Sequence, residues 1–335
     1  MAKSKKRRRR RRRNVAGRVL LVFLCLVLTV FAAGALYYNS LLNRLSFDQG
    51  TTGALSQPIA TMAVNPADGA QQAPVPTPNQ PILSDEIQHI TSGNKAEGEV
   101  RRAKNIVNVL LIGSDYRIPN TSDPGRADVT MLASLNKKTG EIKLVSFERG
   151  IMVEVPDVGT DLLTHSFHWG GAELTTNIIR DYFLLDVAGY AHVDFDSFSS
   201  LVNAVGGVDI TLTEEEAWAL KKTAGLNHLD GADALRYCRL RSIDSNWQRI
   251  ARQRTTVQAI LNQVKDMNLA ELNRLAETIL PLVHTDLSKG EITSILMSAP
   301  KVLGKTAEQM AVPDHNDQHC DFQYESDRLQ NFLYG

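Results

Sequence analysis

The longest apolar stretch of the chain lies close to its start. Residues 19–38, "VLLVFLCLVLTVFAAGALYY", contain no charge over twenty positions. At about 1.5 Å per residue, a helix of this length crosses a hydrocarbon core of about 30 Å. The pattern therefore predicts a transmembrane helix over residues 19–38. A cleaved signal peptide is the alternative, because "FAAGALYYN" contains small residues, but the apolar run is longer than a typical h-region.

The composition changes after this run. Residues 39–104 lack long apolar runs, and their middle, "GTTGALSQPIATMAVNPADGAQQAPVPTPNQP", is rich in Pro, Ala, Gln, Thr and Gly. Such a composition buries too little surface to offset the entropy of ordering the chain. Residues 39–104 are therefore predicted to form a stalk or linker.

From residue 105 to residue 335, strand-like and helix-like patterns alternate. "NIVNVLLIG" is typical of a buried strand, "VTMLASLNKKTGEIKLVSFERG" of a β-hairpin, and "YAHVDF" and "VDITL" of two further strands. "LTTNIIRDYFLL" and "DSFSSLVNAVGG" have helical patterns, the second with Asp196 or Ser197 as its N-cap. The chain after Ser245 is mostly helical, with breaks at Pro281 and Pro300. This alternation predicts a single α/β sandwich domain with a mixed central sheet.

Charge is segregated along the chain. The sequence has 37 basic and 37 acidic residues, but residues 1–18 hold eleven Lys and Arg and no acid, which leaves an acidic remainder. A basic tail of this kind can bind nucleic acid, yet the apolar run behind it favours a topology signal that also contacts anionic lipid. By the positive-inside rule, we expect a single-pass membrane protein with residues 1–18 cytoplasmic and the domain extracytoplasmic. No nucleic-acid partner is predicted.

Two of the three cysteines, Cys238 and Cys320, lie in the predicted extracytoplasmic part. An even pair outside the cytoplasm allows one disulfide, and two separate thiols are the alternative. Their spacing carries no metal signature.

Six arginines occur within residues 235–254, "LRYCRLRSIDSNWQRIARQR". "YCRLRSI" as a short strand would place Arg239 and Arg241 on one side. Ser245 and Gln248 match a capping box, which predicts a helix from about Asn246. The apolar residues of that helix mark its inner face, and Arg249 and Gln253 are predicted to lie on or beside this face. Arg236, Arg252 and Arg254 are expected at the surface or in ion pairs. Arginines where a strand meets a helix N-terminus suit phosphate, although pairing with the acids of the domain is the other interpretation.

Acidic and basic residues also gather at two predicted strand ends. Asp115 follows the first buried strand, and Arg126 and Asp128 precede the next. These residues could simply form ion pairs, but two carboxylates beside arginines could also hold Mg²⁺ together with phosphate oxygens. The combination of metal, arginines and a membrane tether points to a lipid-linked diphosphate, for which positioning and electrostatics supply most of the catalysis.

Five ordered blocks of the chain together resemble the LytR-CpsA-Psr family of cell-wall glycopolymer transferases. They are "VNVLLIGSD", "GRADVTMLASLNKKTGEIKLVSFERG", "THSFHWGGAELT", "YAHVDFDSFSSLVNAVGGVDITL" and "HLDGADALRYCRLRSIDSNWQRIARQR". The resemblance implies an α/β/α sandwich with a groove for a polyprenyl chain. It also implies a phosphotransferase that moves a glycopolymer from a polyprenyl-diphosphate carrier onto peptidoglycan, with Mg²⁺ as cofactor. A polyprenyl diphosphate phosphatase activity could accompany this transfer.

The family pattern can be carried onto individual residues of this chain. It implies that Asp115 and Asp128 hold Mg²⁺ and act in catalysis with Arg149. The residues implied to bind phosphate are Arg126, Arg149, Arg239, Arg241, Arg249 and Gln253. The chain departs from the family pattern at three places. Glu148-Arg149-Gly150 replaces Pro-Arg-Asp, and Leu162 replaces a lysine. The segment "DSNWQR", with Asn246 and Gln248, replaces Asp-x-Asp-x-Gly-Arg.

Near the missing lysine stand two histidines, His165 and His168. One of them could donate to phosphate, but packing beside Phe167 and Trp169 is the favoured interpretation, ahead of a metal site. The departures as a whole motivate a second hypothesis, a non-catalytic envelope protein that binds or regulates polyprenyl phosphates. The sequence leaves open the glycopolymer, the acceptor glycan and the oligomeric state.

Overall fold

The structure, a computed structural model, describes residues 39–40, 42–44, 46–47, 89–115, 125–241, 243, 245–265, 267–302, 304–314 and 319–335. The predicted transmembrane helix at 19–38, the basic tail and most of the predicted stalk lie outside these residues. Within the described part, no helix is long and apolar enough to cross a membrane. The fold described below belongs to the compact unit that begins at Ser46.

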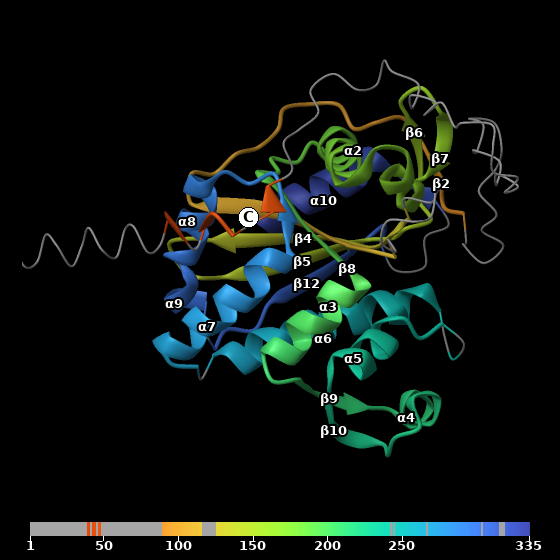
Figure 1. The fold of residues 1–335 in the computed structure, drawn as a ribbon. Helices are drawn as coiled ribbons and strands as arrows, with labels where there is room; N and C mark the ends of the chain where they lie inside the picture. The colour runs from red at the N-terminus through yellow and green to blue at the C-terminus, as the bar shows by residue number, and fades with distance from the viewer. Residues whose placement is uncertain are drawn as a thin grey trace, which may run out of the picture. The chain divides into compact units, whose positions relative to one another are not determined.

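A seven-stranded mixed sheet forms the centre of this unit (Figure 1). The strand order is β1-β11-β8-β3-β4-β5-β12. The pair β3–β4 is antiparallel and the pair β3–β8 is parallel, so the predicted mixed sheet is confirmed. The strands are β1 (Ser46–Phe47), β3 (Ile106–Ser114), β4 (Ala127–Asn136), β5 (Ile142–Phe147), β8 (Gly189–Asp194), β11 (His284–Thr285) and β12 (Glu308–Val312).

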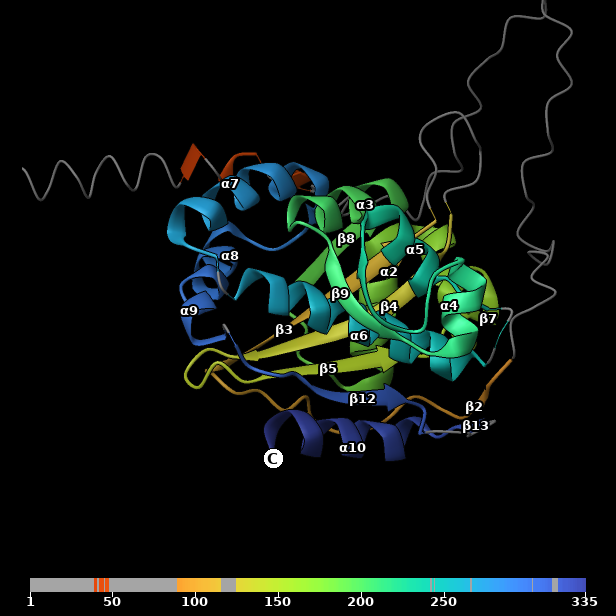
Figure 2. The ribbon, with the colours of Figure 1, turned by 90° about the horizontal axis from the view of Figure 1, so that it is seen from below.

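Helices cover both faces of the sheet, with α2 and α10 on one face and α3 and α6 on the other (Figures 1 and 2). The helices are α2 (Ser166–Phe183), α3 (Phe195–Ala204), α4 (Glu214–Leu220), α5 (Gly231–Cys238), α6 (Asn246–Val264), α7 (Leu269–Ile279), α8 (Lys289–Leu296), α9 (Ala299–Val302) and α10 (Phe322–Tyr334). The described residues also form the short 3₁₀ turns η2 (Leu163–His165) and η3 (Leu280–Leu282). Three two-stranded ribbons complete the fold: β9 (Val208–Leu212) with β10 (Gly225–Leu229), β6 (Met152–Val155) with β7 (Gly159–Leu162), and β2 (Thr91–Ser92) with β13 (His319–Cys320).

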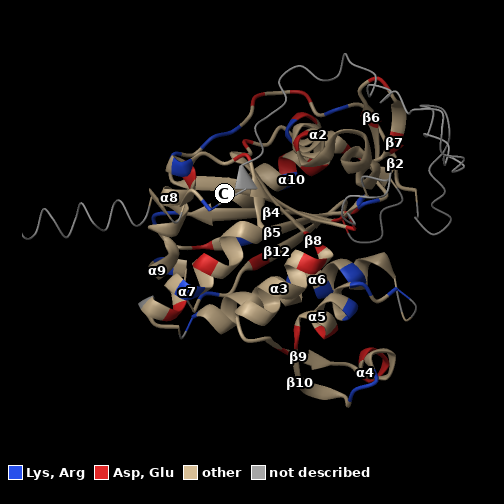
Figure 3. Ribbon diagram, in the orientation of Figure 1, with Lys and Arg blue, Asp and Glu red and all other residues tan. Residues whose placement is uncertain are grey.

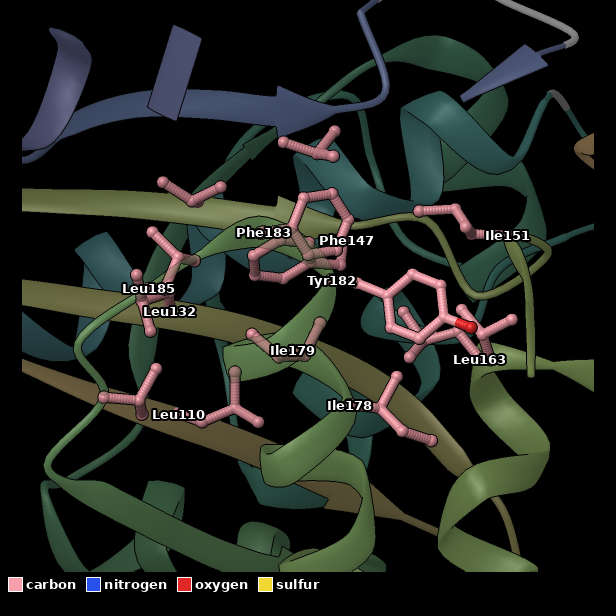
Figure 4. Close-up of a cluster of buried hydrophobic side chains, with 14 of the residues drawn as sticks. Leu110, Leu132, Phe147, Ile151, Leu163, Ile178, Ile179, Tyr182, Phe183 and Leu185 are labelled. Atoms are coloured by element: carbon pink, nitrogen blue, oxygen red, sulfur yellow. The ribbon is translucent and has the colours of Figure 1, made fainter. Parts of the chain in front are cut away.

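The main hydrophobic core lies between the sheet and the α2–α10 layer (Figure 4). Phe147 of β5 packs on Phe183 of α2 at 5.0 Å between ring centroids, and Phe183 packs on Phe322 of α10 at 5.2 Å. Ile90 and Ala96, which precede residue 105, are also part of this core. The chain therefore contributes to the domain core before the first long strand begins.

The predicted β-hairpin and the strands predicted at "NIVNVLLIG", "YAHVDF" and "VDITL" are present, but a further predicted strand was assigned wrongly. "YCRLRSI" is not a strand, because Tyr237 and Cys238 are the end of helix α5. The Asp230 side chain caps this helix by accepting from the N–H of Asp233, and Ala234 and Cys238 are buried at a helical spacing of four. Arg239 and Arg241 therefore follow a helix end.

Two helix starts also differ in detail from the predictions. Helix α3 is capped by Asp194, whose carboxylate accepts from the N–H of Ser197, so neither Asp196 nor Ser197 is the cap. Helix α6 begins at Asn246 as predicted, but its N-cap Ser245 makes no side-chain cap to the backbone. The Ser245 hydroxyl instead hydrogen-bonds the Gln248 side chain, so the reciprocal capping box is not formed.

Cys238 and Cys320 are both buried, and no disulfide joins them. The alternative of two separate thiols is therefore the correct one. Burial raises the pKa of the Cys238 thiol to about 11, despite a hydrogen bond to Thr256 and the nearby charge of Arg252. This thiol is consequently protonated at neutral pH.

Candidate functional site

A cavity of about 280 Å³ lies between the sheet and the layer that contains α3, α5 and α6. Side chains two apart on a strand share a face, and this places Leu111 of β3 and Val129 and Met131 of β4 in the cavity wall. Helices contribute further apolar side chains to the wall, including Phe198, Leu235, Val257, Ile260 and Leu261. Most of the cavity therefore suits an apolar ligand.

Charged and polar side chains also line the cavity. They are Asp128, Asp194, Arg239, Arg241, Arg249 and Gln253. Basic residues are concentrated in the first half of α6 and at the end of α5 (Figure 3). One cavity thus combines an apolar wall with a set of arginines.

Asp128 is at the centre of the polar contacts. Gly113 pairs with Val129 and Ser114 pairs with Ala127, so Asp128 is the extra residue of a β-bulge. A bulge redirects the side chain that it contains. The Asp128 carboxylate oxygen Oδ1 accepts from Arg149 Nη1 and from Arg241 Nη2, each at 3.1 Å. The bulge therefore brings together arginines from two segments that are remote in the sequence.

Arg149 and Arg249 are buried with much of their hydrogen-bonding capacity unused. Arg149 is 5% exposed and Arg249 is 2% exposed. Nε and Nη2 of Arg149, and Nε and Nη1 of Arg249, have no hydrogen-bond partner among the described residues. A buried donor without an acceptor is unfavourable, so these four groups would gain from an oxygen-rich ligand.

The pKa values of Arg149 and Arg249 also favour a negatively charged ligand. Burial and the neighbouring Arg149 lower the pKa of Arg249 to about 10, and Glu148 only partly opposes this. Burial and Arg241 likewise lower the pKa of Arg149, against the attraction of Asp128. Burial and, after it, repulsion between the arginines disfavour the charged form of both side chains, so an anionic ligand in the cavity would stabilise that form.

Asp115 and Arg126 form a separate pair at the end of β3. The Asp115 carboxylate accepts from the Arg126 N–H at 2.5 Å, and Arg126 Nη2 lies 3.8 Å from the other carboxylate oxygen. Ser114 pairs with Ala127 across the two strands. Asp115 follows Ser114 and Asp128 follows Ala127, so both acids lie at the same end of this strand pair. Ion pairing, the commoner outcome for these acids, occurs at both Asp115 and Asp128.

No described group of three or more His, Cys, Asp and Glu side chains could by itself hold a metal ion. A Mg²⁺ ion needs only one or two carboxylates when phosphate oxygens and water supply its other ligands. Asp115 and Asp128, hard oxygen donors beside adjacent strand ends, fit that requirement. Their metal role stays a prediction.

Arg239 and Gln253 are held differently from the other site residues. The Arg239 guanidinium lies over the Phe195 ring at 4.2 Å from its centroid, an arrangement that leaves the edge of the guanidinium for other partners. Gln253 is buried on α6, as predicted, and its Nε2 lies 3.5 Å from the backbone oxygen of Asp128. The structure therefore brings Asp128, Arg149, Arg239, Arg241, Arg249 and Gln253 into one region, as the sequence predicted.

The two histidines beside the replaced lysine have different contacts. Leu162 is buried in the protein interior. His165 Nδ1 lies 2.7 Å from Asp161, and Asp161 also accepts from Trp169 at 2.8 Å. Burial alone would raise the pKa of Asp161, but these two hydrogen bonds and one from the Leu162 N–H lower it. The His168 ring packs edge-on against Trp169, so the predicted packing is seen for His168, whereas the contact of the buried His165 is a hydrogen bond to Asp161.

Arg252 was expected at the surface or in an ion pair, and the structure shows the ion pair. It is buried and pairs with Glu216 at 3.4 Å, and this burial is what the sequence interpretation missed. Thr256 and Ala259, four and seven residues later, are also buried. This second buried row on α6 is the signal that could have identified Arg252.

Comparison with known proteins gives consistent matches. The family model described as "LytR_cpsA_psr family" matches residues 81–334. A protein of Enterococcus faecalis named "Polyisoprenyl-teichoic acid--peptidoglycan teichoic acid transferase TagU" is 30% identical over 203 residues, which cover 59% of this chain and 67% of that protein. The TagT transferase of Bacillus subtilis is 31% identical over 176 residues, which cover 49% of this chain and 55% of that protein.

Solved structures share the fold at lower identity. "TagT bound to LIIa-WTA" superposes with a TM-score of 0.58 and 22% identity, and it covers 73% of this chain and 99% of that one. A structure of TagT "with bound octaprenyl pyrophosphate lipid" superposes with a TM-score of 0.53 and 21% identity, and it also covers 73% of this chain and 99% of that one. At these identities the structural likeness concerns the fold.

Proposed function

The chain belongs to the LytR_cpsA_psr family, and from this premise we propose that it is a glycopolymer phosphotransferase. It takes a glycopolymer of the teichoic acid class from a polyprenyl-diphosphate carrier and transfers it to peptidoglycan. The names of the relatives support the donor and acceptor classes. The octaprenyl pyrophosphate bound to one structural neighbour supports the carrier.

One observation in this chain carries the proposal. The cavity that has the apolar wall also contains Arg249, whose Nε and Nη1 have no partner among the described residues. A ligand that satisfies both parts needs a long apolar tail and a cluster of negative oxygens. A polyprenyl diphosphate has both, and planar guanidinium groups bind phosphoryl oxygens in pairs.

The charged groups of the cavity support a phosphotransfer reaction. The acceptor hydroxyl oxygen attacks the sugar-side phosphorus, the bond from that phosphorus to the bridging oxygen breaks, and polyprenyl phosphate leaves. By family analogy this hydroxyl is the 6-hydroxyl of N-acetylmuramic acid. Arg149, Arg241 and Arg249 stabilise the negative charge on the phosphoryl oxygens.

The hydroxyl proton needs a carboxylate, and we assign this role to Asp115. Asp128 is the less suited of the two because it pairs with two arginines, whereas Asp115 pairs with one. Asp115 and Asp128 would hold Mg²⁺, which when bound supplies further positive charge to the phosphoryl oxygens. With water as the acceptor and polyprenyl diphosphate itself as the donor, the same step would release inorganic phosphate and polyprenyl phosphate, which is the phosphatase side reaction.

The location of the protein is a further part of the proposal. The apolar run at residues 19–38 and the basic residues before it support a single-pass anchor with the domain extracytoplasmic. This arrangement would keep the site near a lipid-linked substrate.

A reconstituted transfer assay tests the proposed function. The double substitution Arg239→Ala with Arg241→Ala should abolish the release of polyprenyl phosphate, because both side chains line the cavity. Arg236→Ala is the matched control, since Arg236 is on the same segment but pairs with Asp233. Retained turnover in the double variant would contradict the proposal.

A second candidate is a non-catalytic protein that binds polyprenyl phosphates. It is favoured by Leu162, a buried apolar side chain at the position where the family pattern has a lysine, and by Gly150 in place of an aspartate. Polyprenyl phosphate that copurifies with the chain, without Mg²⁺-dependent turnover on any carrier, would support this candidate.

A further inference from the structure

The segment of residues 238–241, here called the clamp segment, connects the end of α5 to the loop before α6 and contains two of the phosphate-binding arginines. Helix α6 contacts its backbone and side chains on both sides of Arg239. Cys238 Sγ donates to Thr256 Oγ1 at 3.2 Å, and Arg252 Nη2 donates to the backbone oxygen of Leu240 at 2.8 Å. The second contact fixes the residue that lies between Arg239 and Arg241.

Arg252 is itself held by an acidic residue from another element. Its Nη1 lies 3.4 Å from Glu216 Oε1, and both side chains are buried. Glu216 is in turn fixed in the first turn of α4, where Thr213 and Glu216 form a reciprocal capping box. A chain of contacts therefore runs from α4 through Arg252 to the clamp segment.

Stability alone is a weak reason for a buried ion pair of this kind. Removal of two charges from water is costly, and apolar residues of similar volume are often at least as stable, whereas the ion pair can specify one geometry. The planar guanidinium bridges two acceptors at once, which a lysine cannot do with the same rigidity. Here those two acceptors are Glu216 and the main chain between Arg239 and Arg241.

The two arginines of the clamp segment extend in different directions, and both depend on the backbone position of Leu240 between them. Arg239 lies over the ring of Phe195, whereas Arg241 reaches Asp128 at 3.1 Å. Both contacts depend on the backbone position of Leu240, because the segment is neither helix nor strand there. Loss of the Arg252 contact would move the origins of both side chains.

We propose that Arg252, anchored by Glu216, is a positioning residue for the phosphate-binding arginines of the clamp segment. This inference rests on the proposed function, because it assumes that the clamp binds a diphosphate. It assigns Arg252 no contact with the ligand. Its expected effect is therefore on the diphosphate part of the ligand and not on the prenyl chain.

The experiment measures the affinity of the full chain for octaprenyl diphosphate and for octaprenol in the same detergent. Arg252→Lys keeps the positive charge but cannot contact Glu216 and the Leu240 carbonyl at the same time. We expect at least a tenfold weaker affinity for octaprenyl diphosphate and an unchanged affinity for octaprenol. The double variant Glu216→Leu with Arg252→Met removes both buried charges, and the same selective loss is expected. Thermal unfolding checks that each variant is folded.

A matched control is available in α5. Arg236 also contacts a carboxylate, Asp233 at 2.9 Å, and a backbone oxygen, that of Leu220 at 3.0 Å, but it is largely exposed. Arg236→Lys should change neither affinity.

The outcomes separate the inference from the function on which it rests. A wild-type chain without preference for octaprenyl diphosphate over octaprenol would overturn the proposed function and the inference with it. If the wild type shows the preference, two results would overturn the inference alone. These are wild-type diphosphate affinity in the folded double variant, and an equal loss of affinity for both ligands.

Discussion

The two faces of the central sheet are built from the same strands but are filled in opposite ways. Leu132 of β4 is buried in the core beneath α2 and α10, whereas its neighbour Met131 lies in the wall of the cavity. Aromatic rings fill the first face at centroid distances of 5.0 to 5.2 Å (Figure 4). The second face retains a cavity of about 280 Å³.

This difference indicates that one face mainly stabilises the fold and the other binds a ligand. Close-packed apolar side chains provide most of the free energy of folding. A cavity and buried arginines with unused donors add nothing to that free energy, and they are retained where a ligand uses them. Substitutions on the two faces should therefore affect stability and function in opposite proportions.

The largest effect is expected on the filled face. Phe183→Ala removes a ring that contacts both Phe147 and Phe322, and we expect a loss of about 3–5 kcal/mol in the free energy of unfolding. Urea unfolding followed by circular dichroism measures it. Phe198→Ala, on the cavity side, should lower this free energy by less because Phe198 already borders empty space. Equal losses would show that both faces are packed alike.

Next in size is a functional effect at the buried arginines. Arg249→Met should reduce turnover by about 10²–10³, or about 2.7–4 kcal/mol of transition-state stabilisation. The free energy of unfolding should stay within about 1 kcal/mol of wild type, because a side chain of similar volume replaces a cation that is poorly compensated in the folded state. A fall in stability without loss of turnover would assign Arg249 to the fold instead.

A smaller effect should follow from filling the cavity. Ile260→Phe adds a ring to the cavity wall, and we expect about a tenfold weaker affinity for octaprenyl diphosphate, which corresponds to about 1.4 kcal/mol. The unfolding free energy should change by less than about 1 kcal/mol. Ile179→Phe is the counterpart on the filled face, where overpacking should destabilise by about 1–3 kcal/mol. Equal destabilisation by the two substitutions would mean that the cavity cannot accept a ring.

The smallest effect concerns pH. Burial raises the pKa of the Glu148 carboxyl above its ordinary value of 4.5, and Arg249 and Arg149 oppose this only in part. A raised pKa means that the folded protein retains the proton more strongly, so this stabilising contribution is present below pH 4.5 and is lost as the pH rises through the raised pKa. The unfolding free energy of wild type relative to Glu148→Gln should therefore decrease from about pH 4 to pH 7. Urea titrations across this range measure the difference, and a difference that rises with pH would contradict the assignment.

Local patterns in the sequence predicted one part of the site well. Arg249 and Gln253 were assigned inward because they share a helix face with Ile250 and Val257, and both are buried. The helical spacing alone is sufficient for that inference. The mixed sheet followed in the same way from strands and helices that alternate along the chain.

The parts that failed depend on contacts that are remote in sequence. The segment "LRYC" is too short to distinguish a strand from a helix by periodicity, and the helix that forms is capped by Asp230. The bulge that redirects Asp128 arises from the register between β3 and β4, which no local pattern specifies. The Glu216 partner of Arg252 is 36 residues away, so the burial of Arg252 could be recognised only from its helical spacing to Thr256 and Ala259 in α6.

The edge strand β12 has a consequence for the order in which the molecule can be assembled during synthesis. It pairs in parallel with β5, up to the register pair Val312 and Phe147. The carbonyl of Val312 then accepts from the Glu148 N–H at 2.8 Å, directly before Arg149. A nascent chain on the ribosome therefore carries every arginine of the cavity long before the turn that holds Arg149 is tethered. Val312 follows Arg249 by about 60 residues, so the site cannot be complete before this late strand has been synthesised.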